Sequence, residues 1–189
     1  MKKYLFLPLL PFLFAASCKD DDGPKMEAEP TYEGCCGTTD VLFTVGQGKV
    51  FVPNAFTPNN DGINDIFRPW VNSHVSKIEN LSIKDVNGES LYNLATFDLG
   101  NPDHLAAGAW SGSNDNFVTY YKGLFTYKMK VTDDTGQSAF IEGKACSILC
   151  DSAAVYLKDN PNCTFPTQSD GEGGYDASAP NFENDCFGG

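Results

Sequence analysis

The sequence is poor in histidine and in basic residues. It contains 2 histidines, His74 and His104, and 13 lysines and arginines against 25 aspartates and glutamates. A multi-histidine zinc or iron site is therefore excluded, and histidine-based catalysis has few candidates. The formal net charge of −12 argues against a nucleic-acid partner, because phosphate contacts require clustered lysine and arginine.

The sequence also lacks the motifs of common enzyme classes. It contains no GxSxG, HExxH or GxxxxGK. Ser111 and Ser113 stand near His104 in the sequence, but we interpret them as loop residues at the surface rather than as a catalytic dyad. No two of the many acidic residues are singled out as a glycosidase pair. We therefore expect a protein without enzymatic activity.

Long apolar repeats with a helical period are missing, and the longest apolar run lies at the N-terminus. Met1-Lys2-Lys3 is followed by YLFLPLLPFLFAA over residues 4–16. This run is too short and too often broken by proline to span a membrane as a helix, and it is typical of a secretory signal. We expect residues 1–17 to be a signal peptide.

The end of this segment, Ala15-Ala16-Ser17-Cys18, resembles a bacterial lipobox. The resemblance implies that Cys18 carries acyl chains, which together would hold the protein on a membrane. The alternative is ordinary signal cleavage nearby, with Cys18 a plain cysteine. The KDDDG that follows resembles the signal that sends lipoproteins of the Bacteroidota to the outer face of the outer membrane. Residues 18–34 are expected to be the lipidated cysteine and a flexible acidic tether.

The other cysteines are even in number, which in an exported protein indicates three disulfides. They are Cys35, Cys36, Cys146, Cys150, Cys163 and Cys186. Adjacent strand residues point to opposite faces, so we expect Cys35 and Cys36 to bond to two different partners in the second half of the chain. A bond between Cys163 and Cys186 would contribute about 3 kcal/mol in the chain-entropy model. The alternative is a zinc site formed by Cys35, Cys36, Cys146 and Cys150.

Short β-branched and aromatic segments predict an antiparallel β-sandwich over residues 35–149. Strands are expected at residues 41–45 and 49–53, and in two hairpins at 81–94 and 124–149. The hairpin turns are expected at 85–88 and 133–136. Residues 151–158 are expected to form a short helix capped by Asp151 or Ser152.

The last segment, residues 150–189, is predicted to be an acidic, loop-rich extension. Residues 159–189 contain six acids and no basic residue, a composition that would be disordered alone. Disulfides through its cysteines are expected to hold it on the sandwich. The aromatic residues expected to pack there are Phe165, Tyr175, Phe182 and Phe187.

The stretch PNAFTPNNDGINDIF, residues 53–67, resembles the opening motif of the gliding motility-associated C-terminal domain, which is a type B sorting signal for type IX secretion. The usual form of that motif is P-N-x-F-T-P-N-x-D-G-x-N-D-x-F. The matching residues are Pro53, Asn54, Phe56, Thr57, Pro58, Asn59, Asp61, Gly62, Asn64, Asp65 and Phe67. The resemblance runs from about Cys36 to Leu149, and it implies an immunoglobulin-like sandwich.

The chain also departs from the family pattern. Trp110-Ser111-Gly112 stands where the family shows W-D-G, and Gly123-Leu124-Phe125-Thr126-Tyr127 stands for G-x-Y-x-Y. The domain ends the chain in secreted relatives, whereas 40 residues with three cysteines follow it here. We therefore expect a module reused as the body of a small lipoprotein rather than a sorting signal.

The polar loop of the motif allows two interpretations. Asn59, Asp61 and Asp65 offer hard oxygen ligands around Gly62, as in a calcium loop, although a full EF-hand is excluded because Arg68 stands where it carries glutamate. Alternatively, these side chains bond to their own backbone and fix an irregular crossing between strands. The second acidic loop, residues 169–176, is expected to be an ordinary loop.

These observations lead to an expected function with one alternative. We expect a non-enzymatic lipoprotein of the outer membrane, exposed at the cell surface. Its role would be that of a structural or protein-interaction module linked to gliding motility or type IX secretion, with outer-membrane or cell-surface proteins as partners. The alternative is a glycan-binding or adhesion module in which exposed aromatic residues stack on sugars. The candidates are Trp70, Trp110, Tyr120 and Tyr121, which packing within the fold would equally explain.

Overall fold

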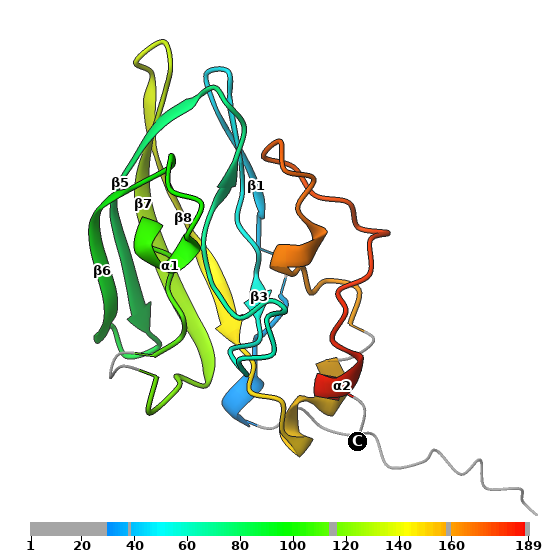
Figure 1. Cartoon of the computed structure of the whole chain (residues 1–189). Coiled ribbons are helices and arrows are strands. Elements are labelled where there is room, and N and C mark those ends of the chain that lie inside the picture. The colour runs from blue at the N-terminus through cyan, green and yellow to red at the C-terminus, as the bar shows by residue number, and fades with distance from the viewer. Residues whose placement is uncertain (1–29, 38, 114–116, 158–159, 188–189) are drawn as a thin grey trace, which may run out of the picture.

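The computed structural model describes residues 30–37, 39–113, 117–157 and 160–187. The expected signal peptide, Cys18 and most of the expected tether lie outside these residues. The described residues form eight strands in two sheets and only short helices (Figure 1). The prediction of an all-β fold is therefore confirmed.

The smaller sheet has three antiparallel strands in the order β1-β2-β4. They are β1 (Leu42–Val45), β2 (Gly48–Phe51) and β4 (Trp70–Val71). Gly46 turns the chain between β1 and β2 with a φ of 57°, a conformation that favours glycine. The two strands expected near residues 41–53 are confirmed, with ends shifted by one or two positions.

The larger sheet has five strands in the order β3-β8-β7-β5-β6. They are β3 (Ala55–Phe56), β5 (Val75–Asp85), β6 (Ser90–Phe97), β7 (Gly123–Asp133) and β8 (Ser138–Ser147). The hairpins β5–β6 and β7–β8 confirm both predicted turns. The expectation of purely antiparallel pairing was wrong, because β3 runs parallel to β8.

Strand β5 begins six residues before the predicted start of its hairpin. Its buried residues Val75, Ile78 and Leu81 are spaced by three, and the pairing with β7 shifts at two places along the strand. Asn80 has a φ of 54° within the second shift. A bulge inserts a residue and breaks the period of two, which is why the alternation typical of strands is hidden here.

The main core lies between the two sheets and is centred on a cluster of aromatic rings. The Phe125 ring contacts Phe67 at 4.9 Å and Trp110 at 5.1 Å between ring centroids. Phe56 joins them at 5.6 Å from Trp110. All four side chains are fully buried. Edge-to-face and tilted pairs of this kind add to the hydrophobic stabilisation of the core.

A second, smaller core lies at one end of the larger sheet and is closed by disulfides. The bonds are Cys35–Cys146, Cys36–Cys163 and Cys150–Cys186. The adjacent Cys35 and Cys36 thus bond to different partners, as expected, and the Cys163–Cys186 bond does not form. The expected alternative, a zinc site, is wrong here because its four cysteines are all in disulfides and none provides a thiolate ligand.

The helices are short. They are η1 (Pro30–Tyr32), α1 (His104–Ala107), η2 (Ser152–Leu157), η3 (Pro166–Gln168) and α2 (Asn184–Phe187). The helix predicted at 151–158 is the 3-10 helix η2, and the Asp151 carboxylate accepts from Ala153 N at 3.1 Å at its start. None of the helices within the described ranges is long and apolar enough to cross a membrane.

The end of the predicted flexible tether belongs to the folded body. Tyr32 is buried, and its hydroxyl both donates to the carbonyl and accepts from the amide of Leu149, at 2.9 Å each. The Nζ atom of Lys122 lies 5.0 Å from the centroid of the Tyr32 ring in a cation–π contact. The expected boundary at residue 34 was therefore wrong, because Tyr32 provides apolar surface for the second core.

Replacing Phe125 by alanine is expected to lower the free energy of unfolding by about 3–5 kcal/mol, because it opens a cavity inside the aromatic cluster. Denaturant unfolding followed by tryptophan fluorescence measures this change. Phe140→Ala is the matched control, since Phe140 lies on β8 of the same sheet with 65% of its surface exposed. The control should cost less than about 1 kcal/mol. Equal losses in the two variants would show that the aromatic cluster does not carry the stability assigned to it.

Candidate functional site: the motif loop, the tail and the adjoining groove

The motif of residues 53–67 divides into buried ends and an exposed tip. Phe56 and Phe67 lie in the main core, so the two phenylalanines of the motif are packing residues. Asn59, Asp61 and Gly62 are exposed at the tip. Asn60, Gly62 and Asn64 have φ values of 62°, 87° and 50°, in the left-handed region that glycine and asparagine tolerate best. Backbone conformation therefore explains the glycine at position 62 and the asparagine at position 64 of the motif.

The expected calcium ligands meet in this tip and act as acceptors for its backbone. Asp65 accepts from the amides of Asn59 at 3.0 Å and Asn60 at 2.6 Å through Oδ1, and from Gly62 N at 2.7 Å through Oδ2. Asp61 Oδ1 accepts from Ile63 N at 2.7 Å. Asp61 Oδ2 accepts from Asn59 Nδ2 at 2.9 Å. This geometry favours the interpretation as a turn fixed by its own side chains.

The buried polar residues of the motif bind the C-terminal extension. Asn54 Oδ1 accepts from Thr164 N at 2.7 Å, and Asn54 Nδ2 donates to the carbonyl of Asn162 at 2.8 Å. The amide of Asn54 donates to Thr164 Oγ1 at 3.1 Å, and Ala55 N donates to the Thr164 carbonyl at 3.1 Å. The extension thus lies along β3 and satisfies an asparagine that would otherwise be buried without partners.

A second set of contacts joins the other end of the motif to the same extension. Asn64 Nδ2 donates to Glu183 Oε1 at 2.6 Å and to the Asn181 carbonyl at 2.8 Å. Thr57 Oγ1 donates to Glu183 Oε1 at 2.5 Å. Asn64 Oδ1 accepts from Thr167 N at 2.9 Å. One carboxylate oxygen of the extension therefore bridges Thr57 and Asn64, two of the residues that match the family motif.

Glu183 is an ionisable group in an apolar place. Its side chain is 2% exposed, and its Oε2 atom has no hydrogen-bond partner among the described residues. Burial raises the pKa of Glu183, the hydrogen bonds from Thr57 and Asn64 lower it in part, and the negative charges of Asp61 and Asp65 raise it further. The sulfur atoms of Cys150 and Cys186 lie within 4.8 Å of its ligand atom, but both belong to one disulfide and offer no thiolate to a metal.

The aromatic residues of the extension follow the expectation with one exception. Phe165 and Phe187 are buried in the second core, and their ring centroids are 6.3 Å apart. Tyr175 stacks on Phe51 of β2 with centroids 5.2 Å apart. Phe182 was expected to pack on the sandwich, but it is 56% exposed because Asn181 and Glu183 on either side turn toward Asn64 and Thr57.

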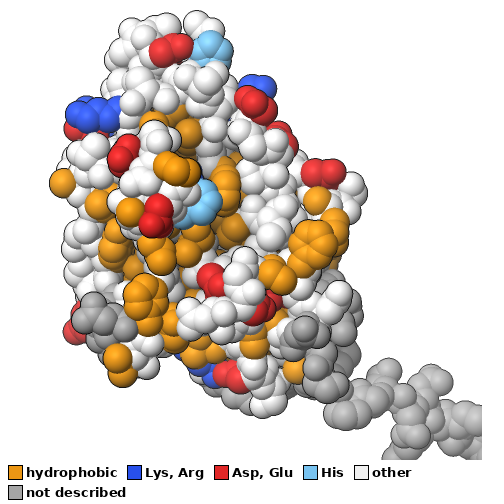
Figure 2. Space-filling view, in the orientation of Figure 1, with side chains coloured by type: hydrophobic (Ala, Val, Ile, Leu, Met, Phe, Trp, Pro, Cys, Tyr) orange, Lys and Arg blue, Asp and Glu red, His pale blue; other side chains and the backbone are white. Residues whose placement is uncertain are grey.

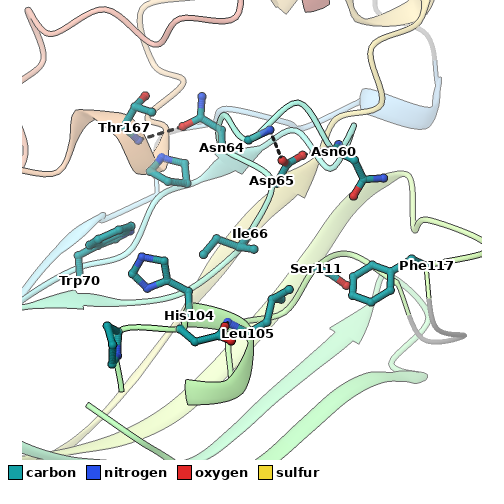
Figure 3. Close-up of a pocket in the computed structure, with 14 residues that line it drawn as sticks. Asn60, Asn64, Asp65, Ile66, Trp70, His104, Leu105, Ser111, Phe117 and Thr167 are labelled. Carbon is teal, nitrogen blue, oxygen red and sulfur yellow. Dashed lines mark hydrogen bonds between the residues drawn. The ribbon is translucent and has the colours of Figure 1, made fainter. Parts of the chain in front are cut away.

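An open groove of about 540 Å³ adjoins the motif loop. Figure 3 shows Ile66 and Leu105 in the middle of the groove and Trp70 and Phe117 at its opposite ends. Asn60 and Asp65 of the motif lie along one side. In Figure 2 apolar side chains gather in the hollow beneath α1, with acidic side chains at its margins. The groove is therefore an apolar surface with a polar rim that the motif loop helps to form.

One wall of the groove is fixed by a buried cation. The Arg68 guanidinium lies over the rings of Trp70 at 4.6 Å and Phe97 at 5.1 Å, and its Nη1 contacts His104 Nδ1. Burial and the positive charge of Arg68 lower the pKa of His104. His104 Nδ1 is thereby engaged, and Figure 3 places Ser111 on the far side of Leu105 from it. The structure does not bring Ser111 and His104 together as a dyad.

The four aromatic candidates for sugar stacking have different positions. Trp110 is 1% exposed and belongs to the main core, so it provides no surface for a ligand. Tyr120 accepts a hydrogen bond from Asn60 Nδ2 at 2.6 Å, and Tyr121 donates to the Leu124 carbonyl at 2.7 Å. Trp70 lines the groove. Sequence reasoning identified Trp70 but missed the groove, because Leu105 and Phe117 reach it only through the fold.

Comparison with known proteins gives no match. No protein-family model, no curated protein and no solved structure matches this chain.

Replacing Asp65 by alanine is expected to lower the free energy of unfolding by about 1–3 kcal/mol, because three backbone amides lose their acceptor. The loss should be the same in millimolar calcium and in chelator. Thermal unfolding in both solutions, with calcium titration calorimetry, measures it. Stabilisation of the unmodified protein by calcium that Asp65→Ala abolishes would restore the calcium interpretation.

The buried Glu183 makes stability depend on pH in a defined direction. Its folded pKa is raised above the ordinary value of 4.5, so the unfolded chain binds fewer protons in this range and stability falls as pH rises through the folded pKa. Glu183→Gln keeps the acceptor for Thr57 and Asn64 but removes the titration. Its melting temperature should therefore rise relative to the unmodified protein as pH increases above about 4.5. The control is Glu172→Gln at the exposed tip of the extension; parallel pH profiles for Glu183→Gln and the unmodified protein would contradict the assignment.

Proposed function

We propose that this chain is a non-enzymatic, lipid-anchored interaction module at the cell surface, linked to gliding motility or type IX secretion. The resemblance of residues 53–67 to the motif of the gliding motility-associated C-terminal domain supports the link. The lipobox-like Ala15-Ala16-Ser17-Cys18 and the KDDDG after it support the anchor and the outer-membrane location. Three disulfides fit a protein exported to an oxidising compartment.

We also propose an immunoglobulin-like topology for the domain. The neighbours β8-β7-β5-β6 follow the order of strands G, F, C and C′ in a variable-type immunoglobulin domain. In the second sheet, β2 pairs with β4, and Phe67, just before β4, forms an isolated β-bridge with Trp110. In this proposal β2 and the chain around β4 correspond to strands A and B. Strand E is reduced to the region of Trp110.

The groove beside the motif loop is the observation that carries the interaction role. Leu105 and Phe117 line it and are 45% and 51% exposed, and the neighbouring Val118 is 79% exposed. Clustered apolar side chains at the surface, rimmed by polar groups, are typical of protein-binding sites. A protein partner would bury the side chains of Leu105 and Phe117, which are exposed to water in the free protein. It would also contact Asn60 and Asp65 at the rim of the groove.

The hydrogen bonds of the motif support a role other than sorting. Asn54, Thr57 and Asn64 are buried and engaged with residues 162–183 of the same chain. A receptor could read these side chains only after displacing an extension that two disulfides hold. We therefore propose that the motif serves here to attach the extension, and that partners contact only its exposed tip.

Glycan binding is the second candidate, and Trp70 supports it. This residue lines the same groove as Asp103, Asn60 and Thr167, so the groove offers an aromatic ring together with polar groups able to bond to hydroxyls. Binding of a neutral oligosaccharide on a glycan array, lost in Trp70→Ala, would favour this function over a protein partner.

Crosslinking on intact cells with a membrane-impermeant reagent, followed by affinity capture and mass spectrometry, tests the leading proposal. Components of the outer-membrane secretion or gliding machinery should be captured with the unmodified protein. Capture should fall about tenfold for the double variant Leu105→Ser/Phe117→Ser, because apolar anchors dominate such interfaces.

The matched control is Leu42→Ser/Val86→Ser, which removes two exposed apolar side chains distant from the groove in sequence. It should capture the same partners at the level of the unmodified protein. Equal capture by the groove variant would remove the groove from the proposal. Labelling without any protein partner would favour glycan binding or adhesion, and absence of labelling would contradict the surface location.

A further inference from the structure

The described cations are concentrated on one sheet of a strongly acidic protein. The whole chain has a formal net charge of −12. Yet the three neighbouring strands β5, β7 and β8 carry most of the described basic residues. These are Lys77 and Lys84 on β5, Lys128 and Lys130 on β7, and Lys144 on β8. Segregation of the minority charge onto one surface creates a local positive field on a negative molecule.

The strand register places these lysines in neighbouring rows on the outer face of the sheet. Thr126 of β7 lies between Lys84 of β5 and Lys144 of β8 in one row. In the next row, Lys128 lies between Ser82 and Glu142. The alternate residues of β7, such as Phe125 and Tyr127, are buried beneath in the main core. The lysine face, defined here by Lys84, Lys128, Lys130 and Lys144, is therefore fixed on a rigid support.

Two of these lysines are available to a ligand. Lys128 pairs with Glu142 at 2.9 Å, and Lys130 lies 3.9 Å from Glu79. Lys84 and Lys144 form no ion pair with any other described residue, and both are exposed. They stand two strands apart, about 10 Å between backbones, so their long side chains can reach a common anionic group above Thr126.

The surface between them is a shallow trough rather than a flat plane. It has a volume of about 560 Å³ and includes Asn80, Ser82 and Thr126, whose amide and hydroxyl groups can bond to a ligand. Phe140 lies at its side with 65% of its surface exposed and with Lys128 Nζ 5.3 Å from its ring. Cations, hydroxyls and an exposed aromatic ring therefore line one trough, and its one carboxylate, Glu142, is paired with Lys128.

We propose that the lysine face binds a linear polysaccharide that carries carboxylate groups, with Lys84 and Lys144 as its charge contacts. A trough about three strands wide can hold a single saccharide chain between Lys84 and Lys144. The hydroxyl and amide groups of Thr126, Ser82 and Asn80 can bond to sugar hydroxyls, and the exposed ring of Phe140 offers an apolar face to a sugar ring. The proposal does not rest on the interaction role of the groove, because the two surfaces share no lining residue.

The test measures binding of polygalacturonate to the full-length chain in neutral detergent, by titration calorimetry and affinity electrophoresis. The unmodified protein should bind it, bind neutral dextran not at all, and lose affinity as salt rises. The double variant Lys84→Gln/Lys144→Gln should raise the dissociation constant about tenfold with an unchanged melting temperature. Lys49→Gln is the matched control for loss of a cation, since Lys49 is exposed on β2 of the other sheet, and it should bind as the unmodified protein does.

Three competitors decide the class of ligand: polyglutamate, vesicles of phosphatidylglycerol and duplex DNA. The proposal requires each to bind at least about tenfold more weakly than polygalacturonate at matched charge and salt. No binding of polygalacturonate, or the same affinity in the double variant, would overturn it. Equal binding of a competitor, lost in the same variant, would overturn the polysaccharide assignment and give the lysine face to that class instead.

Discussion

The passage of the chain from the smaller to the larger sheet at β3 is the constraint on which the other features depend. Ala55 and Phe56 are consecutive strand residues, so their side chains point to opposite sides. Phe56 enters the main core and Ala55 enters the second core. The pairing of β3 with β8 then brings Asn54 beside Thr164 and Thr57 beside Glu183. Two residues of strand thus join both cores and set the path of the extension.

The second core explains how a segment with few apolar residues folds at all. The extension is acidic and rich in glycine, and its own burial could not offset the entropy of ordering it. The bonds Cys36–Cys163 and Cys150–Cys186 close loops of 127 and 36 residues, which in the chain-entropy model corresponds to about 5 and about 4 kcal/mol. That stabilisation is large enough to tolerate the burial of Glu183, whose charge is disfavoured in this place.

Much of the fold could be predicted because it is encoded locally. The turn residues at 85–88 and 133–136 and the alternation along β7 identify two hairpins, and adjacency alone separates the partners of Cys35 and Cys36. The motif loop was predictable as far as its turns, because Gly62 and Asn64 are residue types that tolerate positive φ.

The start of β5 could not be predicted from the sequence, because a bulge interrupts the strand's period of two. The parallel pairing of β3 and the contacts of Asn54, Thr57 and Asn64 join residues more than 90 positions apart, for which the sequence of one chain gives no signal.

The same topology determines which surfaces remain open. The segment around Tyr32 and the disulfide of Cys146 cover only one end of the outer face of the larger sheet, where η1 packs on β7. Beyond that end the outward residues of β7 and β8 stay exposed, and an exposed sheet face tolerates lysine because its stem can lie along the strands while the charge stays in water. The groove arises differently, because the loop of residues 60–66, the segment that carries α1, and residues 166–167 of the extension meet beside β4 (Figure 3). One surface is a continuous sheet and the other is assembled from loops, so substitutions in the loops can change the groove while the sheet register keeps the lysine face intact.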